Sequence, residues 1–153
     1  MATWADFAAA APDIAAEGQR LILARGDGEA LLATVRGDDL PRIHPVNVAI
    51  VNGGLYAFII GRSPKKADLE IDGRYALHTH QDPLAPSEVM LRGRARLVTD
   101  ATERAAVGAG WAFEVDDAYA LFEFDIAIAL LGARPTADDW PPRYSTWKDE
   151  AGA

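Results

Sequence analysis

A small basic group stands at the start of an expected helix, in the segment GRSPKKADLEIDG. Ser63 is a favourable N-cap and Pro64 fits the first helical position. The first turn of a helix carries partial positive charge, yet Arg62, Lys65 and Lys66 lie beside it in a chain with three lysines in all. Unpaired N–H groups at a helix start bind phosphate readily, and these cations with the Ser63 hydroxyl would complete such a site. A solvated charged turn accounts for the same residues, so the group alone leaves both interpretations open.

The segment RIHPVN places a histidine within an expected strand, directly before a proline. Because Pro45 has no N–H to donate to a neighbouring strand, this strand is expected at a sheet edge or at a bulge. The backbone groups freed at such an edge can hydrogen-bond a flat heteroaromatic ligand. A plain edge strand that exposes His44 to solvent is the alternative interpretation.

Other histidines and arginines occur at strand spacing. His78 and His80 are two residues apart, so both side chains point to the same face of a strand. A metal site needs a third ligand, and no spacing motif supplies one, so structural histidines are favoured and no metal site is expected. Arg92, Arg94 and Arg96 share one strand face, which fits a subunit interface, a ligand groove or a solvent-facing strand equally well.

The composition bounds the class of protein. A chain of 153 residues, half of them hydrophobic, predicts one globular domain. Its net charge of -8 argues against binding to nucleic acid or to an anionic membrane. The absence of cysteine excludes disulfides and thiolate metal sites. No serine-hydrolase, zinc-protease, P-loop or dinucleotide motif occurs, and the lack of a signal peptide or an apolar span predicts a cytoplasmic protein.

The hydrophobic pattern predicts mainly β structure with flanking helices. Two N-terminal helices are expected within residues 3–25 and an irregular, Pro-rich tail over residues 134–153. Six strands are expected over residues 30–36, 42–51, 55–60, 75–80, 88–98 and 119–130, with further helices over 64–71 and 102–110. Asn52–Gly54 marks a hairpin turn, and Gly93 a bend or close backbone approach. An antiparallel six-stranded β-barrel follows from this order.

The ordered set of segments from about residue 20 to 130 resembles the pyridoxamine 5'-phosphate oxidase-like superfamily of FMN-binding split β-barrels. The segments that carry the resemblance are ALLATVR, GDDLPRIHPV, NGGLYAFIIGRSPKKADLEIDGRYALHT and EVMLRGRARLV. The resemblance implies a single flavin-binding domain over residues 1–153. It also implies a homodimer with FMN in a groove between the subunits.

The resemblance also assigns residues to the cofactor. Ser63 and Lys65 match the family's Ser-x-Lys phosphate element, and the next strands match those along the isoalloxazine ring. The cofactor-binding residues that the resemblance implies are Arg62, Ser63, Lys65, Lys66, His44, Pro45, Val46, Asn47, His78 and Thr79. No catalytic acid or base is assigned, although His44 is a candidate because its reference pKa lies near neutrality.

The implied function is a flavin-dependent oxidoreductase that acts on a small molecule. A deazaflavin-binding reductase, or a flavin-binding or sensing dimer without significant turnover, is the alternative. The tail lacks the arginine-rich segment of true pyridoxamine phosphate oxidases, which argues against that substrate. Trp140, Tyr144 and Trp147 in the tail have two interpretations: packing on their own barrel, or reaching the cofactor groove to shield the ring from water.

Overall fold

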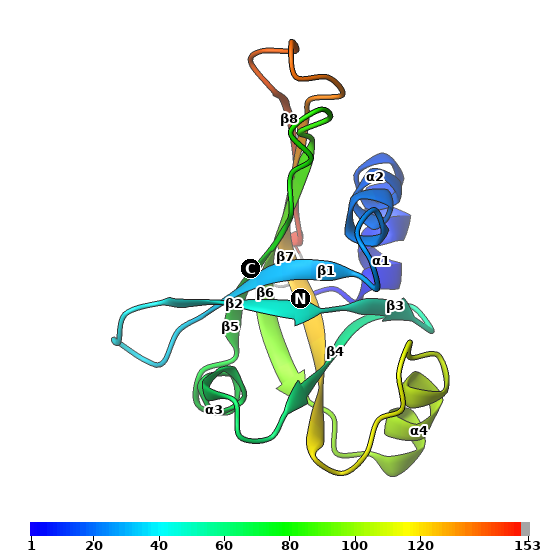
Figure 1. Cartoon of the computed structure of the whole chain (residues 1–153), viewed down its shortest axis with the longest axis vertical. Helices are drawn as coiled ribbons and strands as arrows, with labels where there is room; N and C mark the ends of the chain where they lie inside the picture. Colours follow the sequence, from blue (N-terminus) through cyan, green and yellow to red (C-terminus); the bar gives the residue numbers. More distant parts are fainter. Residues whose placement is uncertain (151–153) are drawn as a thin grey trace.

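Eight strands form one antiparallel sheet that curls into a barrel, and four helices flank it (Figure 1). The computed structural model describes residues 1–150. The helices are α1 (Trp4–Ala10), α2 (Pro12–Leu23), α3 (Pro64–Ile71) and α4 (Ala101–Ala109). The strands are β1 (Glu29–Thr34), β2 (Arg42–Asn47), β3 (Ala49–Val51), β4 (Gly54–Ile60), β5 (Arg74–Thr79), β6 (Glu88–Leu97), β7 (Tyr119–Ala133) and β8 (Arg143–Lys148). The main path through the sheet is β2-β1-β5-β6-β7-β4-β3, and β8 pairs with β7.

A single residue links the two strands at the ends of the sheet. β2 and β3 lie at opposite ends of the sheet, yet only Val48 separates them along the chain, so the sheet must curl back on itself. The Val48 N–H donates to the carbonyl oxygen of Gly28 at 3.0 Å. Gly28 has φ +81°, and a Cβ at this position would overlap the Val48 carbonyl. Glycine is therefore required at position 28, where the start of β1 approaches Val48 after β2.

The expectation of six strands is corrected to eight. The expected strand over residues 42–51 is two strands, because at Val48 the chain leaves its pairing with β1 and begins to pair with β4. The hairpin turn at Asn52–Gly53 is confirmed, with φ values of 48° and 81°. The expected close approach at Gly93 is also confirmed: the β6–β7 register shifts there, and a Cβ would overlap the Asp125 carbonyl.

The tail is not irregular throughout, because β8 extends the sheet. β7 has 15 residues, and β6 occupies one of its edges along most of this length. On the other edge, β4 pairs only with Tyr119–Glu123, which leaves the rest of β7 open. Ala2 bridges Ile126 there, and β8 then pairs from Ile128 to Ala133. The polar sequence of β8 is compatible with this position, since backbone hydrogen bonds supply the pairing.

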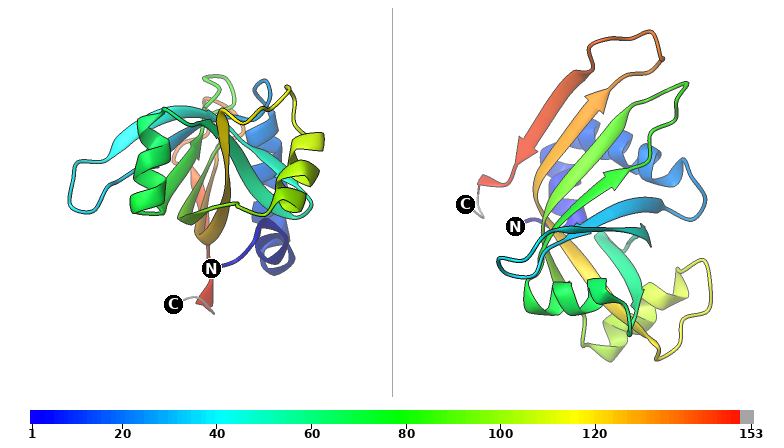
Figure 2. Two further views of the ribbon diagram at one scale, coloured as in Figure 1. Left: turned by 90° about the horizontal axis from the view of Figure 1, so that it is seen from below. Right: turned by 60° about the vertical axis from the view of Figure 1, so that its left-hand side comes forward.

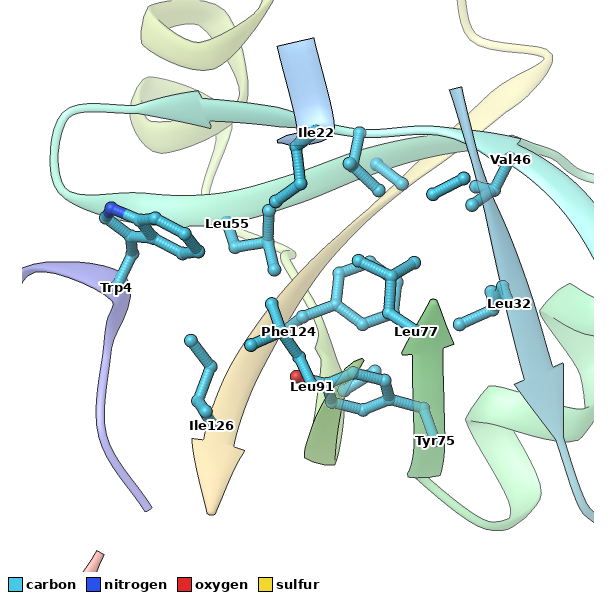
Figure 3. Close-up of a cluster of buried hydrophobic side chains, with 14 of the residues drawn as sticks. Trp4, Ile22, Leu32, Val46, Leu55, Tyr75, Leu77, Leu91, Phe124 and Ile126 are labelled. Carbon is cyan, nitrogen blue, oxygen red and sulfur yellow. The ribbon is translucent and has the colours of Figure 1, made fainter. Parts of the chain in front are cut away.

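Two hydrophobic clusters lie on the two sides of β7. Phe124 and Ile126 point into the main core with Leu77 and Leu91 (Figure 3). Leu121 points the other way, into a smaller cluster covered by α4. The main core continues under α1 and α2, which pack together on one side of the sheet (Figure 2).

The expected N-terminal helices are confirmed. Thr3 and Asp6 form the capping box of α1, and Pro12 opens α2. Within residues 1–150, no helix combines the length and apolar character needed to cross a bilayer.

The tail aromatics divide between the two interpretations. Trp147 packs on its own barrel, with its ring centroid 5.1 Å from that of Phe7. Trp140 is 74% exposed and Tyr144 59% exposed. Packing on the barrel therefore accounts for Trp147, whereas shielding of a cofactor stays a prediction for Trp140 and Tyr144.

The two tail tryptophans should differ in their effect on stability. We expect Trp147→Ala to lower the free energy of unfolding by about 2–3 kcal/mol, because it removes a large ring from the core margin. Trp140→Ala should lower it by no more than about 1 kcal/mol, since the ring is exposed and loses mainly its cation–π contact with Arg134. Urea denaturation followed by circular dichroism measures both values. Equal losses for the two variants would contradict this packing.

Candidate functional site

The N-terminus of α3 carries hydrogen-bond donors without partners. Ser63 is the N-cap, with φ -72° and ψ 137°, but its side chain makes no capping hydrogen bond. Pro64 occupies the first turn, and no acidic residue lies in that turn. The Lys66 N–H donates to the Ser63 carbonyl oxygen at 3.1 Å. The Lys65 N–H and the Ser63 hydroxyl are left as donors for an anion at this helix start. The sequence-based helix and its N-cap residue are confirmed.

The three cations beside this helix have different surroundings. Lys66 forms an ion pair with Glu70, with Nζ 2.6 Å from Oε1. Lys65 is half-buried, and among the described residues it has no hydrogen bond or ion pair. Burial lowers the pKa of Lys65 below its ordinary value. Arg62 is exposed and likewise unpaired within residues 1–150. Lys65 is thus a cation whose charge a bound anion would stabilise.

A buried carboxylate fixes α3 against the sheet. Asp68 is 1% exposed and accepts a hydrogen bond of 2.8 Å from the Thr34 hydroxyl. Arg36 donates to it at 2.8 and 3.0 Å, and Arg42 at 2.9 and 3.0 Å. Burial by itself raises the pKa of Asp68, but these donors outweigh it and hold the pKa below its ordinary value. The helix start is therefore held at a set position beside β1 and β2.

The edge position of β2 is confirmed, since β2 ends the sheet path. His44 pairs across the ladder with Leu32, which is fully buried, and its Nε2 lies 3.2 Å from the Thr34 hydroxyl. Burial and the charge of Lys65 lower the pKa of His44. His44 therefore belongs to the same group of residues as Lys65 and Asp68.

The remaining strand residues of the implied site lie on two different faces. Pro45, Leu31 and His78 stand in one row across β2, β1 and β5, and this row faces away from the core. Val46 is buried in the core, whereas Asn47 is half-buried. Because neighbouring strand residues alternate between faces, His44 and Pro45 cannot contact a ligand from the same side of the sheet.

The last two implied residues have side chains that are already engaged. Thr79 is 1% exposed, and its hydroxyl accepts the Val89 N–H at 3.0 Å. His78 donates through Nδ1 to the Thr79 carbonyl at 2.6 Å, and its Nε2 lies 3.3 Å from Glu88. His78 is thereby oriented on the outer face, whereas the Thr79 side chain stabilises the β5–β6 pairing.

Solved structures share this architecture at low sequence identity. The heme-binding protein from Mycobacterium smegmatis superposes with a TM-score of 0.66 and 19% identity, over 89% of this chain and 58% of that one. General stress protein 26 from Bacillus anthracis superposes with a TM-score of 0.61 and 18% identity, over 87% of this chain and 97% of that one. A candidate pyridoxamine 5'-phosphate oxidase from Listeria innocua superposes with a TM-score of 0.56 and 18% identity, over 71% of this chain and 90% of that one.

The fold is the pyridoxamine 5'-phosphate oxidase-like split barrel. The expected fold is confirmed by these superpositions, apart from the number of strands. This split barrel spans 58% of the length of the mycobacterial protein. No family model and no curated protein sequence matches the chain.

The split barrel leaves the phosphate-binding candidates outside its enclosed spaces. Cavities of about 270–380 Å³ lie at five other places on the described chain. One of about 300 Å³ borders Asn47 and is otherwise lined by residues of α2, β3 and the segment before β7. Within residues 1–150, His, Asp and Glu side chains form no group that could hold a metal ion. Arg62, Ser63, Lys65 and Lys66 line none of these five cavities, whereas Thr34 lines one of them.

Sequence reasoning missed the residues that position this site. Thr34, Arg36, Arg42 and Asp68 were not among the candidates, although together they hold α3 against the split barrel. One signal was available, because Asp68 lies next to Leu69 on the side of the helix that faces the sheet. A charged residue on the buried face of a helix indicates a paired partner elsewhere in the chain.

The two neighbouring lysines should affect the ligand-free split barrel differently. We expect Lys65→Met to leave the melting temperature unchanged or to raise it, because it removes a half-buried cation without a partner. Lys66→Met should lower stability by about 0.3–0.5 kcal/mol through loss of its i,i+4 ion pair. Methionine keeps a helix propensity close to that of lysine, so the comparison isolates the charge. Differential scanning calorimetry without ligand measures both variants, and a clear loss for Lys65→Met would show that its charge is paired.

Proposed function

We propose that this chain binds FMN at the N-terminus of α3 and acts, as a homodimer, as a flavin-dependent oxidoreductase on a small molecule. The observation that carries the proposal is Lys65: a half-buried cation without a partner, next to a helix start whose N-cap hydroxyl is also free. A protein does not gain stability from such a residue. A bound anion accounts for it.

A phosphate monoester is the anion that best matches these donors. It carries about -1.5 to -2 charges at neutral pH and three acceptor oxygens. Lys65 and Arg62 would balance that charge, and the Ser63 hydroxyl with the Lys65 N–H would donate to the oxygens. Lys66 contributes less, because Glu70 already neutralises it.

The outer face of the sheet edge is the candidate surface for the planar ring. Pro45 and His78 lie there in one row, and β2 has no strand on its outer edge. Ile43, on the same face of β2 as Pro45, is 71% exposed. A single chain offers no second wall over this surface, so we infer that a second copy of the chain supplies it and completes a groove.

The bound flavin would supply the hydride chemistry, by accepting or donating hydride at its ring. The chain's own residues bind the phosphate, orient the ring along β2 and exclude water once the second subunit covers the edge. His44 stays neutral near pH 7, since burial and Lys65 lower its pKa. It is a candidate to accept a hydrogen bond or a proton from the ligand.

Absorption spectroscopy of the purified chain tests the proposal and separates its alternatives. We expect a yellow protein with the two-band spectrum of oxidised flavin, and a dimer by light scattering. A single deazaflavin band would favour the deazaflavin-binding alternative. A Soret band would favour heme, which the name of the mycobacterial structural relative makes the third possibility. A colourless protein that does not bind added FMN would overturn the proposal.

Substitution of the two lysines should have unequal effects on FMN affinity. We expect Lys65→Met to raise the dissociation constant of FMN by about 10- to 100-fold, since a charge-assisted hydrogen bond is worth about 1.5–3 kcal/mol. Lys66→Met should raise it no more than about threefold, because Glu70 already neutralises that cation. Quenching of flavin fluorescence measures both constants. Riboflavin, which lacks the phosphate, serves as the control ligand and should bind both variants alike.

FMN affinity should also depend on pH in a defined direction. Phosphate binding favours protonated Lys65, so the pKa of Lys65 is higher in the complex than in the free chain. Affinity should therefore fall as pH rises through the free-state pKa, which burial sets below the ordinary lysine value of 10.5. Below about pH 6 affinity should fall again as the phosphate gains its second proton. Dissociation constants from pH 5 to 10 measure this profile. In Lys65→Met the affinity should no longer fall at high pH, whereas its fall below about pH 6 should remain.

A further inference from the structure

A hydrogen-bonded chain connects a buried carboxylate to the imidazole at the sheet edge. The Thr34 hydroxyl lies 2.8 Å from Asp68 Oδ2 and 3.2 Å from His44 Nε2. Thr34 and Asp68 are each 1% exposed. The chain joins three elements, α3, β1 and β2, at the group of residues around Lys65.

The directions of these hydrogen bonds follow from which groups can donate. Asp68 is ionised, because its donors outweigh burial and lower its pKa, so its oxygens can only accept. The Thr34 hydroxyl therefore gives its one proton to Asp68 and keeps its lone pairs for the imidazole. It can be bonded to His44 only if Nε2 carries a proton and donates it. Neutral His44 then has a bare Nδ1.

Burial first, and then the charges around His44, lower its pKa and keep that second nitrogen unprotonated. The groups that act on His44 are Lys65 and Asp68 from α3 and Arg42 from its own strand. The two cations disfavour an imidazolium and outweigh the single carboxylate, which Arg36 also neutralises. Nδ1 is therefore a neutral acceptor, with the cations Lys65 and Arg42 nearby.

We propose that Thr34 and Asp68 are positioning residues that hold His44 as its Nε2–H tautomer, so that Nδ1 accepts a hydrogen bond from an O–H group of the bound ligand. The proposal rests on the proposed function for the identity of that ligand, which is FMN. FMN carries ribityl hydroxyls next to its phosphate, and a hydroxyl donor needs an acceptor rather than a further cation. The opposite tautomer would present an N–H to them and repel them.

The tautomer can be measured in the ligand-free protein. The chain has three histidines, so a long-range ¹H–¹⁵N spectrum of the labelled protein contains three ring systems, and His44→Gln identifies one of them. We expect His44 to show a protonated Nε2 and a bare Nδ1, with its Nε2 proton protected from exchange with water. His78 is the internal control with a protonated Nδ1, because that atom donates to a carbonyl oxygen.

Two substitutions of Thr34 separate positioning from simple packing. Thr34→Val keeps the shape of the side chain but removes the hydroxyl, so the Nε2 proton of His44 should exchange rapidly and both tautomers should appear. Thr34→Ser keeps the hydroxyl and should restore the wild-type signals. The proposal is overturned if wild-type His44 carries its proton on Nδ1, or if Thr34→Val leaves the His44 signals unchanged.

A double-mutant cycle with FMN tests the contact to the ligand. Thr34→Val and His44→Gln should each weaken FMN binding about tenfold, and the double variant should bind no more weakly than His44→Gln, because Thr34 acts through His44. Additive losses would overturn the positioning role, and unchanged affinity in His44→Gln would overturn the contact. If the wild-type chain does not bind FMN, the proposed function fails, and the tautomer measurement alone decides the positioning role.

Discussion

The candidate site depends on one buried carboxylate. Asp68 projects from α3 into a position where water cannot reach it, and a buried charge costs several kcal/mol unless it is fully paired. Arg36 and Arg42 supply the charge, and Thr34 supplies a further donor. Because these partners lie on or beside β1 and β2, the carboxylate sets where α3 begins relative to the sheet edge. Removal of one partner from such a group typically costs about 3–5 kcal/mol.

The same arrangement leaves Lys65 in an unfavourable environment. Asp68, on the same helix, is already engaged by two guanidinium groups, so it offers Lys65 little compensation. Lys66, one residue further, reaches Glu70 instead. The fold thus accepts an unpaired, half-buried cation at the helix start, which is the kind of local cost that proteins retain at binding sites. Removal of the Lys65 charge is therefore expected to keep or raise the stability of the ligand-free chain and to weaken ligand binding.

The architecture of the barrel follows from how the edges of its strands are shared. β7 is long enough to pair with β6 on one edge and with β4, Ala2 and β8 in succession on the other. Val48 alone links β2 to β3 at opposite ends of the sheet path, and Gly28 lets the start of β1 approach it. β2 begins beside α3, where Arg42 pairs with Asp68, and β2 ends the path through the sheet (Figure 1).

The sequence by itself determined the features that arise from local physics. The start of α3, the hairpin at Asn52–Gly53 and the edge position of the strand with Pro45 follow from capping, from φ preferences and from a missing N–H. The order of these segments was enough to indicate the split-barrel fold. The basic residues of the site were likewise visible as a charge pattern that a helix start does not favour.

Only the tertiary structure decided which of those residues are available. The partners of Asp68 lie 26 to 34 residues away along the chain, and nothing in the local sequence pairs them with it. The distinction between Lys65 and Lys66, and the separation of His44 and Pro45 onto opposite faces, depend on where α3 and β2 meet. β8 forms where an edge of β7 is open, which the local sequence does not reveal. Pairing and burial are set by elements distant in sequence, whereas capping and turn formation act over a few residues.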